Sequence, residues 1–206
     1  MTSSDACTAI RVAVLGGWVP SQLADVLTLQ RAEEPETRGA LVECARSRPA
    51  GEVSRGGFDF ALSTADVDWP GWVCEPLWHD MLAVAVAKRS HLLVHREVPC
   101  HEVRKQPLIG AQSTADEPWQ ALVHRLIGDA PHQQLVSTFD MAMTLVAAGY
   151  GIAIAPAKRL AGYQCRGIAV RPLADAPLIV VCYLLHRCEP LTEPQERFAR
   201  RVRSVT

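Results

Sequence analysis

The stretch LVAAGYGIAIAP, residues 145–156, constrains the fold of this 206-residue chain more than any other segment. Its first half is apolar and is typical of the end of a buried helix. Two glycines, Gly149 and Gly151, then precede an apolar run that ends at Pro156. Gly149 stands where many helices end with a residue in the left-handed conformation. The pattern therefore predicts a helix, a tight reversal and a buried strand.

Strands and helices alternate outward from this stretch. We expect strands at residues 10–15, 39–45, 58–63, 108–111, 134–136, 152–155, 168–173 and 178–185, with a long extended segment at 72–87. We expect helices after Pro20, at 114–127, 137–148 and 192–203, and a poor short helix at 48–56. This alternation predicts an α/β fold with mostly parallel strand pairing.

The composition is that of a soluble globular protein, with 49% hydrophobic and 21% charged residues, and it excludes a disordered chain. The length suits one compact domain, or one domain made of two lobes. The net charge is −1, whereas a free-standing DNA-binding module usually carries a basic excess. We therefore expect that this chain is not the part of a protein that grips DNA.

The first residues show no secretory signal, and no apolar run approaches the length of a membrane span. The seven cysteines are odd in number and scattered, without a C-x-x-C pair, which indicates reduced thiols. We expect a cytoplasmic protein that makes no contact with a membrane.

Residues 145–156 resemble the signature of the effector-binding domain of LysR-type transcriptional regulators. Other segments agree with that family in order and spacing: GFDFAL at 57–62, EPLWHD at 75–80, PLI at 107–109 and a final helix that contains Phe198. Each segment alone is weak evidence, but together they are specific. The resemblance extends from about residue 10 to 203, which is nearly the whole chain.

The resemblance implies a type II periplasmic-binding-protein-like fold, in which two α/β lobes are joined by two crossing strands and a small molecule binds in the cleft between the lobes. Lobe I would hold residues 8–84 plus 169–206, and lobe II residues 85–168. The crossings would fall near 82–87 and 168–171.

Members of the family carry an N-terminal helix-turn-helix domain, and none can be placed here because the first strand begins by residue 10. We expect either the sensor half of a longer protein or a natural truncated relative. DNA would then be bound only through a helix-turn-helix domain that is absent from this chain.

The resemblance also implies which residues bind the effector. We expect the effector to be a small organic anion. Helix starts at strand ends suit an anion because their N–H groups are free, although these could simply be well-capped helices. Trp18 departs from the small or hydroxyl residue often found at this position in the family, and could narrow the cleft or stack on an aromatic effector. Arg48 could neutralise a carboxylate or be a solvated charge. The candidate residues are Gly17, Trp18, Ser21, Ser47, Arg48, Ser63, Thr64, Gln112, Ser113, Thr114 and Phe139.

The family's mechanism implies that effector binding shifts a conformational equilibrium. It also implies a homodimer or higher oligomer, in which the first helix and following strand of one copy meet the second-lobe helix and strand of the other. The apolar stripe Trp119, Leu122, Val123 and Leu126 could serve that interface or form the inner face of its own helix.

Three other interpretations stay open: a metal site, a redox pair, and an enzyme or transport protein. We expect no cofactor. His91, His95, Cys100 and His101 lie close in sequence, but Pro99 interrupts the segment and no fourth metal ligand is placed. Cys182 and Cys188 could form a redox pair, although Cys182 lies in an apolar strand. An enzyme or a transport solute-binding protein could share the fold, but the chain lacks G-x-S-x-G, P-loop and H-E-x-x-H motifs. We therefore expect a binding domain and not an enzyme.

Overall fold

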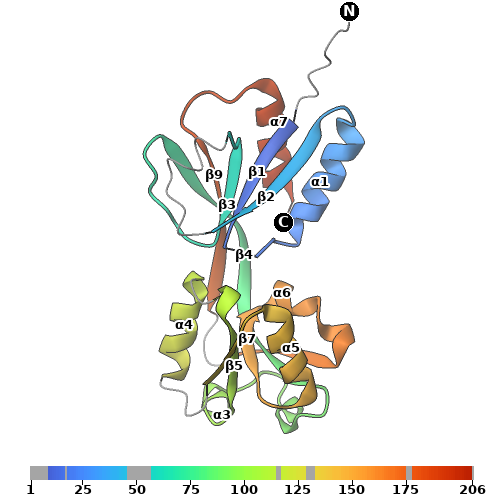
Figure 1. The fold of residues 1–206 in the computed structure, drawn as a ribbon, viewed down its shortest axis with the longest axis vertical. Coiled ribbons are helices and arrows are strands. Elements are labelled where there is room, and N and C mark those ends of the chain that lie inside the picture. Colours follow the sequence, from blue (N-terminus) through green and yellow to red (C-terminus); the bar gives the residue numbers. More distant parts are fainter. Residues whose placement is uncertain are drawn as a thin grey trace, which may run out of the picture. The chain divides into compact units, whose positions relative to one another are not determined.

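The computed structural model describes residues 9–16, 18–45, 57–114, 117–128, 133–174 and 178–205. The chain divides into two compact units, which we call unit 1 (Met1–Trp78 with Cys182–Thr206) and unit 2 (His79–Val181). Two strands, β4 (Trp72–Ala87) and β9 (Ile179–Arg187), each have residues in both units. These strands are labelled in Figure 1.

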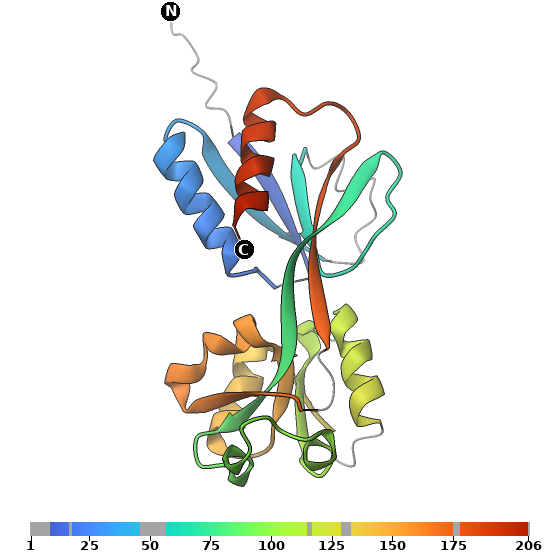
Figure 2. The ribbon, with the colours of Figure 1, turned by 180° about the vertical axis from the view of Figure 1, so that it is seen from behind.

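Unit 1 is built on a sheet in which β1 (Ala9–Leu15) is the parallel neighbour of both β2 (Arg38–Cys44) and β3 (Phe60–Ser63). Strand β9 pairs with β3 in the antiparallel direction. Helices α1 (Gln22–Glu33) and α7 (Glu193–Ser204) contact each other beside this sheet (Figure 2). The core between them is apolar and includes Leu23, Val26, Phe60, Phe198 and Val202.

Unit 2 holds the remaining strands. Strand β4 pairs antiparallel with β7 (Ala153–Pro156) and β8 (Ile168–Pro172), and β5 (Leu108–Ala111) pairs parallel with β6 (Gln133–Val136). A parallel bridge between Leu108 and Ile152 joins β5 to the start of β7. The helical segments are α3 (Cys100–Val103), α4 (Pro118–Ile127), α5 (Phe139–Ala148), α6 (Ala157–Ala161) and the short turns η1 (His91–Val94), η2 (Gln112–Thr114) and η3 (Gln164–Arg166).

The predicted α/β architecture is confirmed, with two differences. Pairing is not mostly parallel, because β9 and β4 form antiparallel pairs with β3, β7 and β8. The helix expected from residue 114 begins at Pro118, and Thr114 is instead the last residue of η2 (Gln112–Thr114). The short helix expected at 48–56 lies outside the described residues.

The lobe limits expected from the sequence, 84/85 and 168/169, stay a prediction. The two compact units of the structure divide at Trp78/His79 and Val181/Cys182. Strand β8 pairs with Ala83–Ala87 of β4. This pairing keeps both segments within unit 2.

The glycines of residues 145–156 act in two distinct ways. Gly149 caps α5 with φ = 89°, so the predicted left-handed helix end is confirmed. At Gly151 a Cβ atom would stand 2.4 Å from the carbonyl oxygen of Pro107. That close approach accompanies a hydrogen bond of 2.9 Å from Ile152 N–H to Pro107 and one of 2.8 Å from Ile109 N–H to Ile152. Gly151 therefore permits β5 to join β7.

A buried ionic network joins α7 to α1 in unit 1. Arg201, which is only 8% exposed, donates from Nε to Glu33 (2.6 Å), from Nη1 to Gln30 (2.7 Å) and from Nη2 to Glu34 (2.5 Å). Arg197 also donates to Glu34 from Nε at 2.6 Å. The hydrogen bond from Arg197, with the further pairing to Arg201, lowers the pKa of Glu34 from 4.5 to about 2.

We expect Gly151→Ala to destabilise the protein by about 2 kcal/mol, because the new methyl group would overlap a backbone oxygen that cannot move without displacing β5. Urea unfolding followed by circular dichroism would measure the loss. Gly162→Ala is the matched control, since Gly162 has φ = −62° and its Cβ would lie 3.7 Å from the nearest atom, Arg159 O. Equal midpoints for both variants would contradict this role of Gly151.

Acid should weaken the α1–α7 junction. Because the folded-state pKa of Glu34 lies below its ordinary value, the carboxylate stabilises the fold fully above pH 4.5, and this contribution disappears as the pH falls toward about 2. We expect Glu34→Gln to cost about 3 kcal/mol at neutral pH and to flatten the acid dependence of stability. Glu193→Gln, which removes an exposed partner of Arg197, should change little. Unfolding curves measured between neutral and acidic pH test this, and an unaltered acid dependence in Glu34→Gln would contradict it.

Candidate functional site

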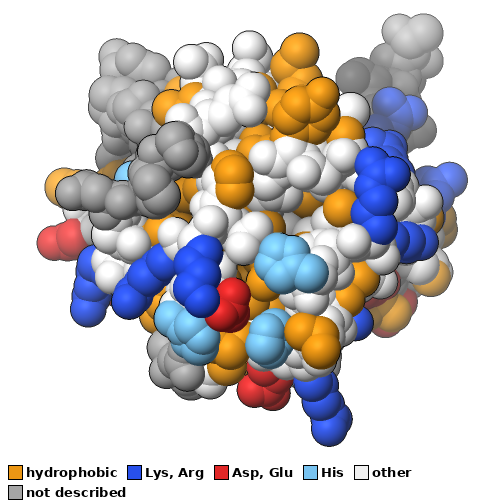
Figure 3. All heavy atoms as spheres, turned by 90° about the horizontal axis from the view of Figure 1, so that it is seen from below, with side chains coloured by type: hydrophobic (Ala, Val, Ile, Leu, Met, Phe, Trp, Pro, Cys, Tyr) orange, Lys and Arg blue, Asp and Glu red, His pale blue; other side chains and the backbone are white. Residues whose placement is uncertain are grey.

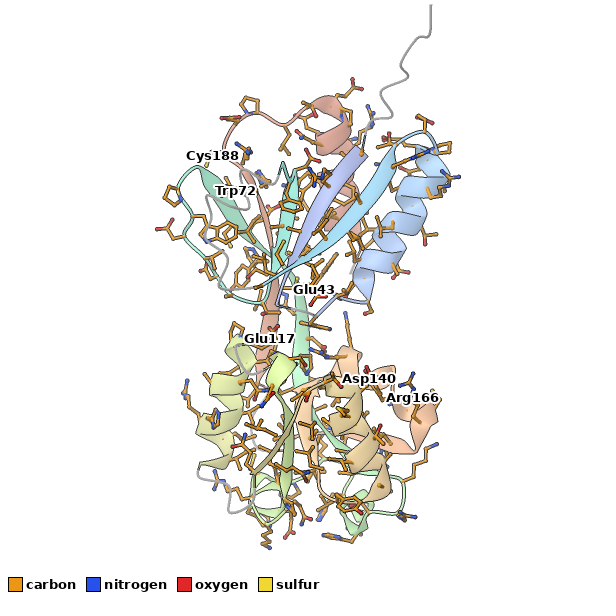
Figure 4. All side chains as sticks on the ribbon, in the orientation of Figure 1. Glu43, Trp72, Glu117, Asp140, Arg166 and Cys188 are labelled. Atoms are coloured by element: carbon orange, nitrogen blue, oxygen red, sulfur yellow. The ribbon has the colours of Figure 1, made fainter. Side chains whose placement is uncertain are left out.

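Three strand ends meet at one edge of unit 2. Strands β5 and β6 are parallel, and the bridge to Ile152 sets the start of β7 parallel to β5. Along the chain, η2 and α4 follow β5, α5 follows β6, and α6 follows β7. Ser113 N–H donates to Ser137 O at 3.3 Å and ties the first two connections together. In open α/β sheets this edge is where ligands bind; Glu117 and Asp140 are labelled there in Figure 4.

The structure brings together the unit 2 residues expected from the sequence. Gln112 and Ser113 are exposed in η2, and Phe139 is the buried first residue of α5. Thr114 is 1% exposed; its hydroxyl donates to Ala111 O at 3.0 Å and accepts from Gln120 Nε2 at 3.3 Å. Thr114 thus holds the turn in shape, while Gln112 and Ser113 present polar groups to solvent.

The corresponding described residues of unit 1 lie at or after the carboxyl ends of the parallel strands β1 and β3. Trp18 is buried, and Ser21, directly before α1, is exposed with its hydroxyl 3.3 Å from Gln22 Oε1. Ser63 and Thr64 are buried; the Ser63 hydroxyl accepts from Ala65 N–H at 3.0 Å. Gly17, Ser47 and Arg48 lie outside the described residues.

Arg159 of α6 was missed by sequence analysis. Its Cζ lies 4.0 Å from the centre of the Phe139 ring, a cation–π contact. Its Nη1 is buried and has no hydrogen-bond acceptor among the described residues. Burial lowers the pKa of Arg159, while the nearby Glu117, Tyr163 and Asp140 act in the opposite direction. A buried hydrogen-bond donor without an acceptor lowers the stability of a fold by about 1–3 kcal/mol. Such a group is therefore uncommon in a native protein.

One signal in the sequence could have found Arg159. It comes three residues after Pro156, where a predicted buried strand ends, as Thr114 comes three residues after Ala111. Had the strand at 152–155 been assigned the same direction as the strand at 108–111, Arg159 would have joined the candidates. The candidates were taken from the positions that the family resemblance implies, and Arg159 is not among them.

The carboxylate beside Arg159 is engaged by other groups. Tyr163 donates its hydroxyl to Asp140 Oδ1 at 3.2 Å, and Arg166 Nη1 donates to the same oxygen at 3.0 Å. The pKa of Tyr163 is raised, mainly by burial and additionally by the nearby carboxylate of Asp140. Asp140 and Arg166 can be followed in Figure 4. Asp140 is thus bound by Tyr163 and Arg166.

A second carboxylate fixes the segment that carries Arg159. Asp80 of β4 accepts Lys158 N–H with Oδ2 at 2.9 Å and Met81 N–H with Oδ1 at 2.8 Å. Burial raises the pKa of Asp80, and the two backbone donors oppose this shift. The contact anchors the start of α6 to β4, so the backbone beside Arg159 is held in place.

The residues that the sequence suggested for a metal site, a redox pair or a dimer interface show no arrangement specific to those roles within the described ranges. Histidine side chains gather on the face shown in Figure 3, but His91 Nε2 lies 3.5 Å from Gln106 Nε2 and His101 pairs with Glu102 at 3.3 Å. Across the described ranges, His, Cys, Asp and Glu form no group of three or more that could hold a metal ion. Cys182 is buried. In the stripe on α4, Trp119 and Val123 are buried, and Leu122 and Leu126 are half-buried, as on an inner helix face.

Among the helices that the structure describes, none is long and apolar enough to cross a membrane.

The family model of the LysR substrate binding domain matches residues 4–206. The chain belongs to this family. The resemblance found in residues 145–156 is therefore confirmed over nearly the whole length, and with it the periplasmic-binding-protein-like fold and the role of an effector-binding domain of LysR-type regulators. No curated protein sequence matches the chain significantly.

Solved structures share the fold of this LysR substrate binding domain. The BenM effector binding domain with its effector benzoate aligns with a TM-score of 0.79 and 20% identity, over 95% of this chain and 90% of that one. A reduced form of OxyR from N. meningitidis aligns with a TM-score of 0.76 and 17% identity, over 97% and 96%. Full-length CbnR complexed with its target DNA aligns with a TM-score of 0.80 and 18% identity, over 96% of this chain and 70% of that one.

Proposed function

We propose that this LysR substrate binding domain senses a small organic anion and performs no chemistry on it. The observation that carries the proposal is the edge of unit 2 where η2, α5 and α6 begin, with exposed polar residues and a buried arginine nitrogen for which the described part of the chain offers no acceptor. The BenM effector binding domain, which has the same fold, is described with the carboxylate benzoate as its effector.

We propose that the effector is bound by the residues expected from the sequence. The described ones are Trp18, Ser21, Ser63, Thr64, Gln112, Ser113, Thr114 and Phe139, and Gly17, Ser47 and Arg48 complete the set. A ligand that binds one conformation of the domain better than another shifts the population toward it, by no more than the difference in affinity. DNA would be contacted by a separate helix-turn-helix domain, in the cytoplasm.

The proposal is tested by thermal unfolding of the purified chain against a panel of small carboxylates. A ligand at 100 times its Kd should add about 2.7 kcal/mol of stability, which raises Tm by about 5–10 °C for a chain of this size. Each ligand would be recovered after incubation and checked by NMR, and we expect it unchanged. Turnover of a bound ligand would contradict a purely sensory role.

Substitutions locate the binding residues. We expect Ser21→Ala and Thr114→Val to reduce the ligand-induced rise in Tm, each compared with its own ligand-free baseline. Thr144→Val is the control, because Thr144 is an exposed residue of α5 whose hydroxyl donates only to Asp140 O of its own helix. If all variants respond as the unsubstituted chain does, the assignment of these residues is wrong.

We also propose a homodimer that uses the exposed apolar residues of α1 and of the edge strands. Leu29 on α1 is 37% exposed, Leu41 on β2 is 44% exposed and Leu135 on β6 is 53% exposed. Strand β2 ends the strand order of its sheet, and an unpaired edge with apolar residues favours association.

We therefore expect Leu41→Glu to shift the protein toward the monomer in sedimentation velocity, because a charge would be buried at the interface. Val94→Glu, at an 81% exposed position of η1, should leave the dimer intact. A monomeric unsubstituted chain, or a dimeric Leu41→Glu variant, would refute this interface.

A further inference from the structure

We propose that Arg159 is the residue that receives the carboxylate of the effector. This inference rests on the proposed function and deepens it, since it assigns both the charged contact and the chemical class of the ligand. The candidate residues drawn from the sequence do not include Arg159.

Two partly or wholly buried arginines of this chain, Arg201 and Arg159, differ in their hydrogen-bond partners. Arg201 in unit 1 has an acceptor for each of three nitrogens, in Gln30, Glu33 and Glu34. Arg159 is shielded by the Phe139 ring, and its buried Nη1 has no acceptor among the described residues. Buried polar groups in native proteins are normally hydrogen-bonded, and an exception at a ligand-binding edge indicates a partner that arrives with the ligand.

Two acidic side chains lie near Arg159, and they bear on the kind of anion that it can bind. Asp140 already accepts from Tyr163 and Arg166, and Glu117 lies near enough to oppose the effect of burial on the pKa of Arg159. With two acidic side chains nearby, an anion that carries a single charge meets less repulsion than a phosphate dianion. A carboxylate is planar and matches the fork of a guanidinium. The site therefore favours a monocarboxylate group over a phosphate group.

The backbone and the side chain of Arg159 are held in position without a ligand. Asp80 holds the Lys158 N–H at the start of α6, and the Phe139 ring lies 4.0 Å below the guanidinium carbon. Thr114 stabilises the neighbouring turn, beside which Gln112 and Ser113 offer neutral polar groups. A cation held this way loses little freedom on binding, which strengthens the contact.

A ligand-free experiment separates binding from a structural role. Arg159→Met keeps the length of the side chain and its contact with Phe139 but removes the unmatched donors. We expect Tm of the ligand-free chain to be unchanged or to rise by about 2–4 °C, as is common when a functional charge is replaced. A fall of several degrees would show that Arg159 stabilises the fold through its charge, and would overturn the proposal.

A binding experiment uses benzoate, phenylacetate and succinate, each with the corresponding uncharged amide, in isothermal titration with the full chain. We expect at least one carboxylate to bind and its amide to bind far more weakly. Arg159→Gln should weaken that carboxylate about ten- to a hundredfold, and Arg159→Lys should restore part of the loss because the charge returns without the fork. Arg125→Gln, at an exposed position of α4, is the control and should bind as the unsubstituted chain does.

The outcomes distinguish this inference from the proposed function. Equal binding of a carboxylate by Arg159→Gln and the unsubstituted chain overturns the role of Arg159 and leaves the sensing function in place. Preference for the amides overturns the carboxylate class in the same way. Failure of every carboxylate and every amide to bind overturns the inference together with the sensing of small molecules of this kind.

Discussion

The candidate site depends on the close approach of two strands at Gly151. A side chain there would meet the carbonyl oxygen of Pro107 at 2.4 Å, so only glycine allows Ile152 and Ile109 to exchange backbone hydrogen bonds with the facing segment. That junction sets β7 parallel to β5 and places the start of α6 beside η2 and α5. Without it, Arg159 and Phe139 would have no reason to meet, because twenty residues of chain separate them.

The two units treat buried charge in opposite ways. In unit 1 Arg201 is surrounded by acceptors from α1, and the lowered pKa of Glu34 shows that the carboxylate is stabilised in its charged form. Charge-assisted hydrogen bonds from Arg201 to Gln30, Glu33 and Glu34 tie two helices together. In unit 2 Arg159 lies over an aromatic ring, and its buried Nη1 has no acceptor among the residues that the structure describes. The first arrangement serves stability, whereas the second is the kind of exception that binding sites retain.

Several features of the fold and site were predictable from local patterns. The left-handed end of α5 follows from Gly149, and the strand–helix alternation follows from apolar periodicity. Thr114 and Phe139 could be placed at one edge because each follows a predicted strand. Arg159 also follows a predicted strand, but the sequence does not show that it lies over the Phe139 ring; that contact depends on the direction of β7 and on packing. The antiparallel pairs of β4 were missed because a strand's apolar run does not record its partner.

The sequence by itself determined the α/β class, the helix end at Gly149 and the family, because these depend on residue types at short spacing. The tertiary structure alone decided that residues 169–181 belong with unit 2, that Glu34 faces two arginines, and that Arg159 has no acceptor for Nη1 among the described residues. Each of these depends on segments that are far apart in the chain. Their proximity is set by strand pairing and side-chain packing, whose energies arise only when the chain has folded.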